Sequence, residues 1–282
     1  MTATPTTARA ATATAPLATD GVTLAYDRLV VAEDLTVEIP AGSFTVIIGP
    51  NGCGKSTLLR ALARTLKPRA GRVLLDGAPM DGMRTKAIAR RLALLPQSPI
   101  APEAITVGDL VARGRYPHQG LLRQWSPEDA RAVDAAMGAT EVTDLKERFV
   151  SDLSGGQRQR AWLAMALAQE TDLLLLDEPT TFLDIAHQYE VMDLCARLHE
   201  EGRTLVAVLH DLNQAARYGS HVIAMKDGRV VAQGPAEEVV TEGLVRDVFG
   251  LAARVVPDPE TGTPMVVPAA RNAHVHHGVE QA

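Results

Sequence analysis

The sequence has few cysteines, few aromatic residues and no long hydrophobic run. Cys53 and Cys195 are the only cysteines in 282 residues. They form neither a disulfide framework nor a metal-binding pattern, and they fit a reducing compartment. Aromatic residues make up only 4% of the chain, so a core must be built mainly from Leu, Val, Ile and Ala.

No apolar run approaches the roughly 20 residues that a membrane-spanning helix needs. The longest runs, around Leu173–Leu176 and Leu205–Leu209, have the length of strands. The first nineteen residues are rich in Ala, Thr and Pro and lack the apolar stretch of a secretory signal. We expect disordered tails at 1–19 and 271–282 and one domain at 20–270. If the protein acts at a membrane, another chain must span it.

The charge balance is acidic. The formal net charge is −6, which repels phosphate backbones, so we expect no nucleic-acid partner. The hydrophobic and charged fractions, 46% and 22%, are typical of a globular protein.

The order of strand and helix patterns predicts an α/β fold with a mostly parallel sheet. Residues 21–40 read as two strands joined at Asp27-Arg28, and Asp227-Gly228 predicts a second hairpin. Residues from about 91 to 169 contain many helix formers and little strand signal, which predicts an inserted helical subdomain. The other expected elements are strands at 44–49, 71–77, 172–178 and 204–210 and helices at 56–68, 184–201 and 211–218.

A glycine-rich segment, GPNGCGKST at 49–57, follows the first buried strand. It fits the phosphate-binding pattern, in which glycines allow backbone N–H groups to surround phosphates at the start of a helix. Lys55 can reach the β- and γ-phosphates, and the Ser56 hydroxyl can bind Mg²⁺. The alternative is an ordinary glycine-rich turn. The position between a buried strand and an amphipathic helix argues against it.

Two adjacent carboxylates, Asp177 and Glu178, end the strand LLLLD. Ligands of open α/β sheets bind at the carboxyl ends of the strands. We therefore interpret Asp177 as the carboxylate on the Mg²⁺ side and Glu178 as the general base for an attacking water. Alone, such a pair could simply cap a helix. With a phosphate loop upstream, catalysis is favoured.

The string LSGGQ at 153–157 is the most specific in the chain. Ser154 and the two glycines offer hydroxyl and N–H donors at a helix start, which makes a second anion site. Two anion sites and two carboxylates in one chain resemble the ATP-binding cassette family. The resemblance implies a P-loop NTPase (RecA-like) core, an N-terminal antiparallel β region and the inserted helical subdomain, with ATP and Mg²⁺ as cofactors.

The resemblance also implies roles for four residues outside these motifs. Gln97 resembles the glutamine that senses Mg²⁺ and water, and His210 the histidine that contacts the γ-phosphate. Asp184 resembles an aspartate at a dimer seam, and Tyr26 the aromatic that stacks on adenine, although Tyr26 could equally be a half-buried strand residue.

Three sets of site residues follow. Those expected to act in catalysis are Lys55, Gln97, Glu178 and His210. Those expected at Mg²⁺ are Ser56, Gln97 and Asp177. Those expected at ATP are Tyr26, Gly49, Pro50, Asn51, Gly52, Cys53, Gly54, Lys55, Ser56, Thr57, Ser154, Gly155, Gly156, Gln157 and Asp184.

Three further segments are similar to the iron-siderophore importers of the family: ITVGDLVARGRYPH at 105–118, TTFLDIAHQ at 180–188 and HDLNQAARYGSH at 210–221. This implies a homodimeric ATPase at the cytoplasmic face of the cell membrane. Its partners would be two integral-membrane permease subunits and, indirectly, a substrate-binding protein.

Several alternatives remain at this point. Haem or cobalamin could be the cargo in place of a ferric siderophore. A soluble ATPase acting on DNA or ribosomes is disfavoured by the single cassette and the absence of a heptad run. An inactive regulatory module has no support, because Lys55, Asp177, Glu178 and His210 are all present.

Overall fold

The computed structural model describes residues 15–120, 125–181 and 183–270. Most of the expected tails, 1–14 and 271–282, therefore lies outside the described residues. The expected N-terminal boundary was wrong in one respect. Strand β1 begins at Leu17, which is fully buried and pairs with Ile39 on one side and Leu75 on the other. Residues 17–19, which were expected in the disordered tail, therefore belong to a sheet. The side chains of Leu17 and Thr19 are buried there.

The predicted mostly parallel core is confirmed. Six strands lie in the order β10-β9-β3-β8-β7-β6, and only the β9–β10 pair is antiparallel. That pair turns at Asp227-Gly228, as predicted. The strands are β3 (Phe44–Ile48), β6 (Leu92–Leu95), β7 (Leu173–Asp177), β8 (Thr204–Val208), β9 (His221–Lys226) and β10 (Arg229–Gly234).

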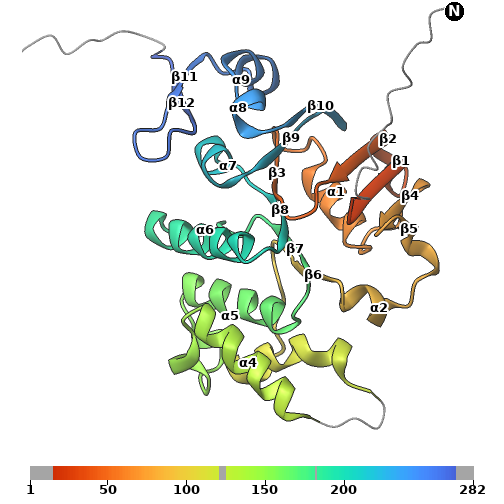
Figure 1. The fold of residues 1–282 in the computed structure, drawn as a ribbon, viewed down its shortest axis with the longest axis vertical. Helices are drawn as coiled ribbons and strands as arrows, with labels where there is room; N and C mark the ends of the chain where they lie inside the picture. The colour runs from red at the N-terminus through yellow and green to blue at the C-terminus, as the bar shows by residue number, and fades with distance from the viewer. Residues whose placement is uncertain (1–14, 121–124, 182, 271–282) are drawn as a thin grey trace, which may run out of the picture.

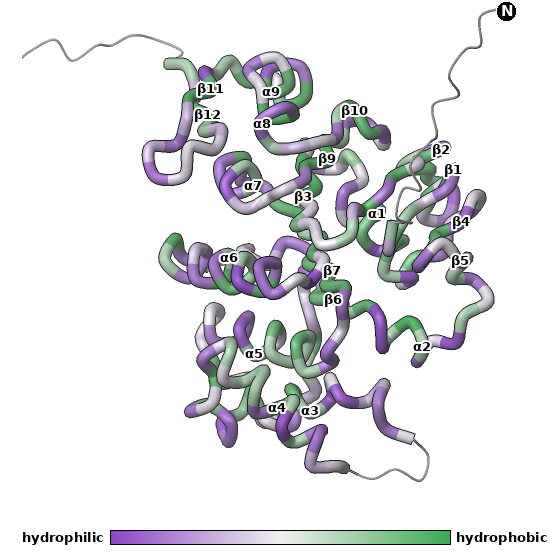
Figure 2. The backbone as a smooth tube through the Cα atoms, in the orientation of Figure 1, coloured by the Kyte–Doolittle hydropathy of each residue, from purple (hydrophilic) through white to green (hydrophobic). Residues whose placement is uncertain are grey.

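The central sheet is buried on both faces, which explains its continuous apolar runs. Alternate residues of each strand enter different cores: Leu174 and Leu176 pack with the helices of one face, whereas Leu173 and Leu175 pack with the N-terminal region. Figure 2 shows hydrophobic segments along β6 and β7. The sheet is therefore a rigid base for groups at its strand ends.

The N-terminal region is a four-stranded antiparallel sheet in the order β2-β1-β4-β5. Helix α1 (Lys55–Leu62) packs between it and the central sheet (Figure 1). The strands are β1 (Leu17–Tyr26), β2 (Leu29–Ile39), β4 (Ala70–Leu75) and β5 (Ala78–Pro79).

Helix α1 is shorter than the expected 56–68. Arg64 adopts a left-handed backbone, with φ of 57°, and the N–H groups of Thr65 and Leu66 both bond to the carbonyl of Arg60. This geometry closes a helix by satisfying its last carbonyls, so Leu66 lies beyond the helix end.

The helical region covers one end of the molecule (Figure 1). The expected start at residue 91 was wrong, because β6 occupies the first residues and joins the central sheet beside β7. The β6 sequence LALL is a short, continuously apolar run, and its periodicity does not distinguish a buried strand from a helix. Its helices are α3 (Val107–Ala112), α4 (Pro127–Ala139) and α5 (Gly155–Ala168), with 3-10 turns at Arg113–His118, Thr143–Leu145 and Val150–Asp152. Helix α2 (Thr85–Ala89) and a 3-10 turn at Met80–Gly82 precede β6, and both contribute to the core of the N-terminal region.

The remaining helices cover the sheet and the C-terminal side. They are α6 (Ile185–Glu200), α7 (Leu212–Tyr218), α8 (Ala236–Val239) and α9 (Glu242–Phe249). A hairpin of β11 (Ala253–Pro257) and β12 (Pro264–Pro268) packs on α7, where Asn213 accepts a 2.7 Å hydrogen bond from the Val266 N–H. Within the described ranges, no helix is both long enough and apolar enough to cross a bilayer.

Candidate functional site

The glycine-rich loop connects buried strand β3 to α1. Gly49 has φ of 152°, and a Cβ there would lie 2.2 Å from the Met225 carbonyl oxygen. Gly54, with φ of 102°, is the N-cap of α1. Only glycine fits both positions. The loop is thereby held against β9 and leads directly into the N-terminus of α1, the position at which helices commonly bind anions.

Lys55 lies over this loop. Its side chain is buried, and Nζ donates hydrogen bonds of 2.8 Å to the Gly49 carbonyl and 3.1 Å to the Pro50 carbonyl. The positive charge is therefore fixed where phosphate oxygens would meet the loop.

Asp177 ends β7 and is only 2% exposed. Burial raises the pKa of its carboxyl, and the Ser56 hydrogen bond and the Arg60 charge offset this only in part. Among the described residues its buried Oδ1 has no hydrogen-bond partner. A carboxylate oxygen beside a serine hydroxyl is the donor set that Mg²⁺ prefers, so these residues fit the metal.

Glu178 is held by three side chains. Gln97 Nε2 donates to Oε2 at 2.6 Å, Thr181 Oγ1 donates to Oε2 at 3.1 Å, and His210 Nε2 lies 2.7 Å from Oε1. Glu178 itself has φ of 54°, an uncommon conformation for a non-glycine residue that is often found at functional sites. The carboxylate is therefore fixed at the end of the sheet.

These contacts also set the protonation state of Glu178. Burial alone would raise the pKa of its carboxyl, but the hydrogen bond and charge of His210, with the bonds from Thr181 and Gln97, outweigh burial. The pKa of Glu178 consequently lies below its ordinary value, and the group is a carboxylate at neutral pH.

The structure thus brings Gln97 and His210 from the ends of β6 and β8 to Glu178, and their roles in catalysis stay predictions. The place of Gln97 at Mg²⁺ stays a prediction. Tyr26 is 38% exposed at the end of β1, and its hydroxyl lies 3.3 Å from Arg60 Nη1. It is open to a ligand, and its stacking on adenine also stays a prediction.

The LSGGQ segment forms the start of α5. Ser154 caps the helix by accepting from the Gln157 N–H, and the Gln157 side chain accepts from the Ser154 N–H. Ser154 and Gly155 are exposed. In the part of the chain that the structure describes, no interaction joins this segment to the glycine loop. The two predicted anion sites of one chain therefore share no hydrogen bond or ion pair within the described residues.

Asp184 caps α6 beside this segment. Its Oδ1 accepts from the His187 N–H at 3.0 Å and lies 2.6 Å from His187 Nδ1. The sequence interpretation missed His187, Thr181 and Arg60. The spacing of His187, three residues after the helix-capping aspartate, was the one signal that could have found it.

The comparisons agree with the motifs. A family model described as "ABC transporter" matches residues 32–181. The ferric enterobactin transport ATP-binding protein FepC of Escherichia coli (strain K12) is 56% identical over 253 residues, covering 89% of this chain and 93% of FepC. The resemblance to siderophore-importer ATP-binding subunits is confirmed.

Two solved structures support the fold. An ABC transporter in an inward-facing conformation has a TM-score of 0.77 at 26% identity, covering 91% of this chain and 98% of that chain. A dimeric, post-hydrolysis state of the ATP-binding cassette MJ0796, bound to ADP and Pi, has a TM-score of 0.70 at 28% identity, covering 78% and 98%.

Proposed function

Because this chain belongs to the ABC transporter family, we propose that it binds and hydrolyses ATP to energise the import of a ferric siderophore. The observation that carries the hydrolytic part is the ionised Glu178, held between Gln97 and His210. The cargo rests on the 56% identity to the enterobactin transport protein.

The nucleotide would lie across the glycine loop. The loop N–H groups and Lys55 would bind the phosphates, and Tyr26 would stack on the adenine. Ser56 and Asp177 would hold Mg²⁺, which neutralises charge on the β- and γ-phosphates when bound.

Hydrolysis transfers the γ-phosphoryl group to water and yields ADP and phosphate. Glu178 is placed to accept the proton of the attacking water. As the water oxygen bonds to the γ-phosphorus, the bond between that phosphorus and the β–γ bridging oxygen breaks. His210 and Gln97 orient that carboxylate. A general base typically contributes about 10²- to 10⁴-fold to the rate.

A second copy would complete the site. Ser154 and Gly155 are exposed and Gly156 is half-buried, and among the described residues none of them bonds to the glycine loop of its own chain. These three residues would therefore bind the γ-phosphate held by the partner subunit. A head-to-tail homodimer would place two nucleotides at one seam, with Asp184 beside it. The dimeric cassette bound to ADP and Pi supports this arrangement.

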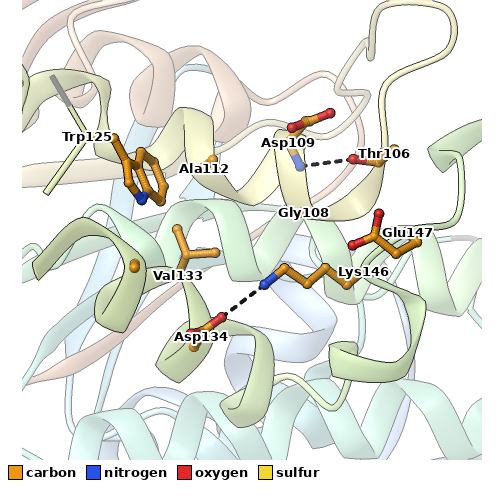
Figure 3. Close-up of a pocket in the computed structure, with 10 residues that line it drawn as sticks. Thr106, Gly108, Asp109, Ala112, Trp125, Val133, Asp134, Lys146 and Glu147 are labelled. Carbon is orange, nitrogen blue, oxygen red and sulfur yellow. Dashed lines mark hydrogen bonds and ion pairs between the residues drawn. The ribbon is translucent and has the colours of Figure 1, made fainter. Parts of the chain in front are cut away.

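The helical region offers a docking site for a permease subunit. A cavity of about 530 Å³ lies between α3 and α4. Figure 3 shows Trp125 at one end of it and Lys146 bonded to Asp134 along its side. Tyr116 and Trp125 are 65% and 49% exposed. We assign this cavity to a helix of the permease pair, which would hold the chain at the cytoplasmic face of the membrane and link it to a substrate-binding protein.

The test is iron uptake by cells whose own copy of the protein carries Lys55→Ala, supplied with a catecholate siderophore, a hydroxamate siderophore or haem. Loss of uptake from one siderophore class would support the proposal and identify the cargo class. Lys67→Ala, at an exposed lysine after α1, is the matched control and should leave uptake intact. Unchanged uptake of both siderophores would overturn the siderophore assignment, and loss of haem uptake alone would establish haem instead.

A second variant, Ala112→Trp, would fill the cavity of Figure 3. We expect it to abolish uptake while the purified subunit still binds ATP. Normal uptake by this variant would contradict the assignment of the cavity as the permease docking site.

A further inference from the structure

His187 lies between the two structural elements that the proposed dimer brings to the partner's nucleotide. One is the segment that carries Asp184, and the other is the start of α5 with Ser154, Gly155 and Gly156. Neither the general base nor the glycine loop uses this histidine, although it belongs to the segment 180–188 that resembles siderophore importers.

The Asp184 carboxylate fixes the imidazole. Oδ1 accepts both the His187 backbone N–H and the ring Nδ1, at 3.0 Å and 2.6 Å. These bonds lower the pKa of Asp184, so the carboxyl is ionised at neutral pH and can only accept. Nδ1 therefore carries a proton, and the ring is oriented by Asp184, the residue that caps the first turn of α6.

The other side of the ring packs against Gly156. A Cβ added to Gly156 would lie 3.1 Å from His187 Cδ2, 3.3 Å from Cγ and 3.5 Å from Nε2. The absence of a side chain at Gly156 therefore leaves room for the imidazole beside the turn that is predicted to bind an anion. A second contact joins α5 to the segment that leads to Asp184: Gln159 Nε2 donates a 2.9 Å hydrogen bond to the Pro179 carbonyl.

We propose that His187 is a positioning residue that sets the distance between Asp184 and the Gly155-Gly156 turn, so that both reach the partner's nucleotide together. This proposal rests on the proposed function, in which that turn completes the partner's site. His187 acts through Asp184 and Gly156, and no contact between its ring and ATP is needed.

A change at His187 should therefore affect the rate of ATP hydrolysis and leave the initial binding of ATP unchanged. The first contact with ATP is made by the glycine loop of the same chain, which His187 does not touch. Closure over the γ-phosphate needs the Gly155-Gly156 turn of the partner, and displacement of a positioned group by about 1 Å can cost on the order of 100-fold in rate.

The experiment measures ATP hydrolysis against ATP concentration in the full transport complex, for wild type, His187→Ala, His187→Asn and His187→Gln. The Asn amide nitrogen takes the place of Nδ1 and can bond Asp184, whereas the Gln amide nitrogen takes the place of Nε2. We expect His187→Ala to lower kcat by about 10-fold or more. His187→Asn should recover most of that loss and His187→Gln should not.

Two further measurements separate positioning from folding. The purified full chain of each variant should bind a fluorescent ATP analogue with unchanged Kd and melt at an unchanged temperature. Glu200→Ala, at the exposed far end of α6, is the control for a change on the same helix and should behave as wild type.

Three outcomes would overturn the proposal: unchanged kcat in His187→Ala, rescue by Gln instead of Asn, or a parallel fall in analogue affinity and melting temperature. Failure of the proposed function is recognised separately, because the wild-type complex would then hydrolyse no ATP.

Discussion

The side-chain amide of Gln97 lies 2.6 Å from Glu178 Oε2, although 81 residues separate them in the sequence. Parallel strands β6 and β7 create this contact by ending side by side, with Leu95 paired to Leu176. Gln97 stands where the chain leaves the central sheet for the helical region. A displacement of the helical region would therefore move Gln97, which donates a hydrogen bond to the proposed general base.

We predict that Glu178→Gln abolishes turnover and traps an ATP-bound dimer. The amide cannot accept the proton of water, whereas Lys55 and the glycine loop are unchanged. Phosphate release should fall by about 10²-fold or more, and size-exclusion chromatography with ATP and Mg²⁺ should show the dimer. Glu201→Gln, at an exposed position after α6, is the control. Normal turnover in Glu178→Gln would remove Glu178 from the general-base role.

We predict that Thr181→Val shifts the acid limb of the ATPase pH profile to higher pH. Glu178 is active as a carboxylate, and its depressed pKa keeps it ionised to lower pH than an ordinary glutamate. Activity should therefore fall only as pH drops through that depressed pKa. Loss of the 3.1 Å bond from Thr181 removes one of the contacts that lower the pKa, while burial still raises it.

The measurement is kcat as a function of pH for both proteins. Because Val matches Thr in shape, packing at the site should be retained, and the rate on the neutral plateau serves as the internal control. An acid limb that stays in place, or that moves to lower pH, would contradict the assigned cause.

Local signals predicted the parts of the site that a single segment builds. The glycine loop and the strand LLLLD were readable because composition and order within a few residues determine them. The extent of α1 and the start of the helical region were not, since a left-handed Arg64 ends the helix and β6 is defined by its pairing with β7. Contacts between distant segments, such as His187 with Gly156, depend on tertiary packing that no local pattern records.

The helical region contains a buried ion pair, Arg115 with Asp129, that we expect to be a main determinant of its stability. Arg115 Nε lies 2.9 Å from Asp129 Oδ1, and both side chains are at least 95% buried. Arg115 also bonds the Ala168 carbonyl and Glu170, so it joins α4 to the end of α5. Removing one member of a buried pair typically costs about 3–5 kcal/mol. Glu170, whose side chain is 57% exposed, would still compensate the Arg115 charge in part, so we expect the lower end of that range.

We therefore predict that Asp129→Asn lowers the free energy of unfolding by about 3 kcal/mol at pH 7, measured from urea denaturation. The matched control is Asp134→Asn on the same helix. Its carboxylate is 67% exposed and lies 3.3 Å from Lys146, so its loss should change stability by about 1 kcal/mol or less. Equal effects of the two substitutions would contradict the prediction.

The same pair predicts a pH dependence. Burial would raise the pKa of Asp129, but the hydrogen bonds from Arg115 and Ser126 and the Arg115 charge outweigh it, so the folded pKa lies below the ordinary value of 3.8. A depressed folded pKa means that the contribution is complete above the unfolded pKa and is lost as pH falls toward the folded one. The stability difference between wild type and Asp129→Asn should therefore be constant from pH 7 to about 5 and shrink below about 4. A difference that grows in acid would show that the carboxylate is not the stabilising form.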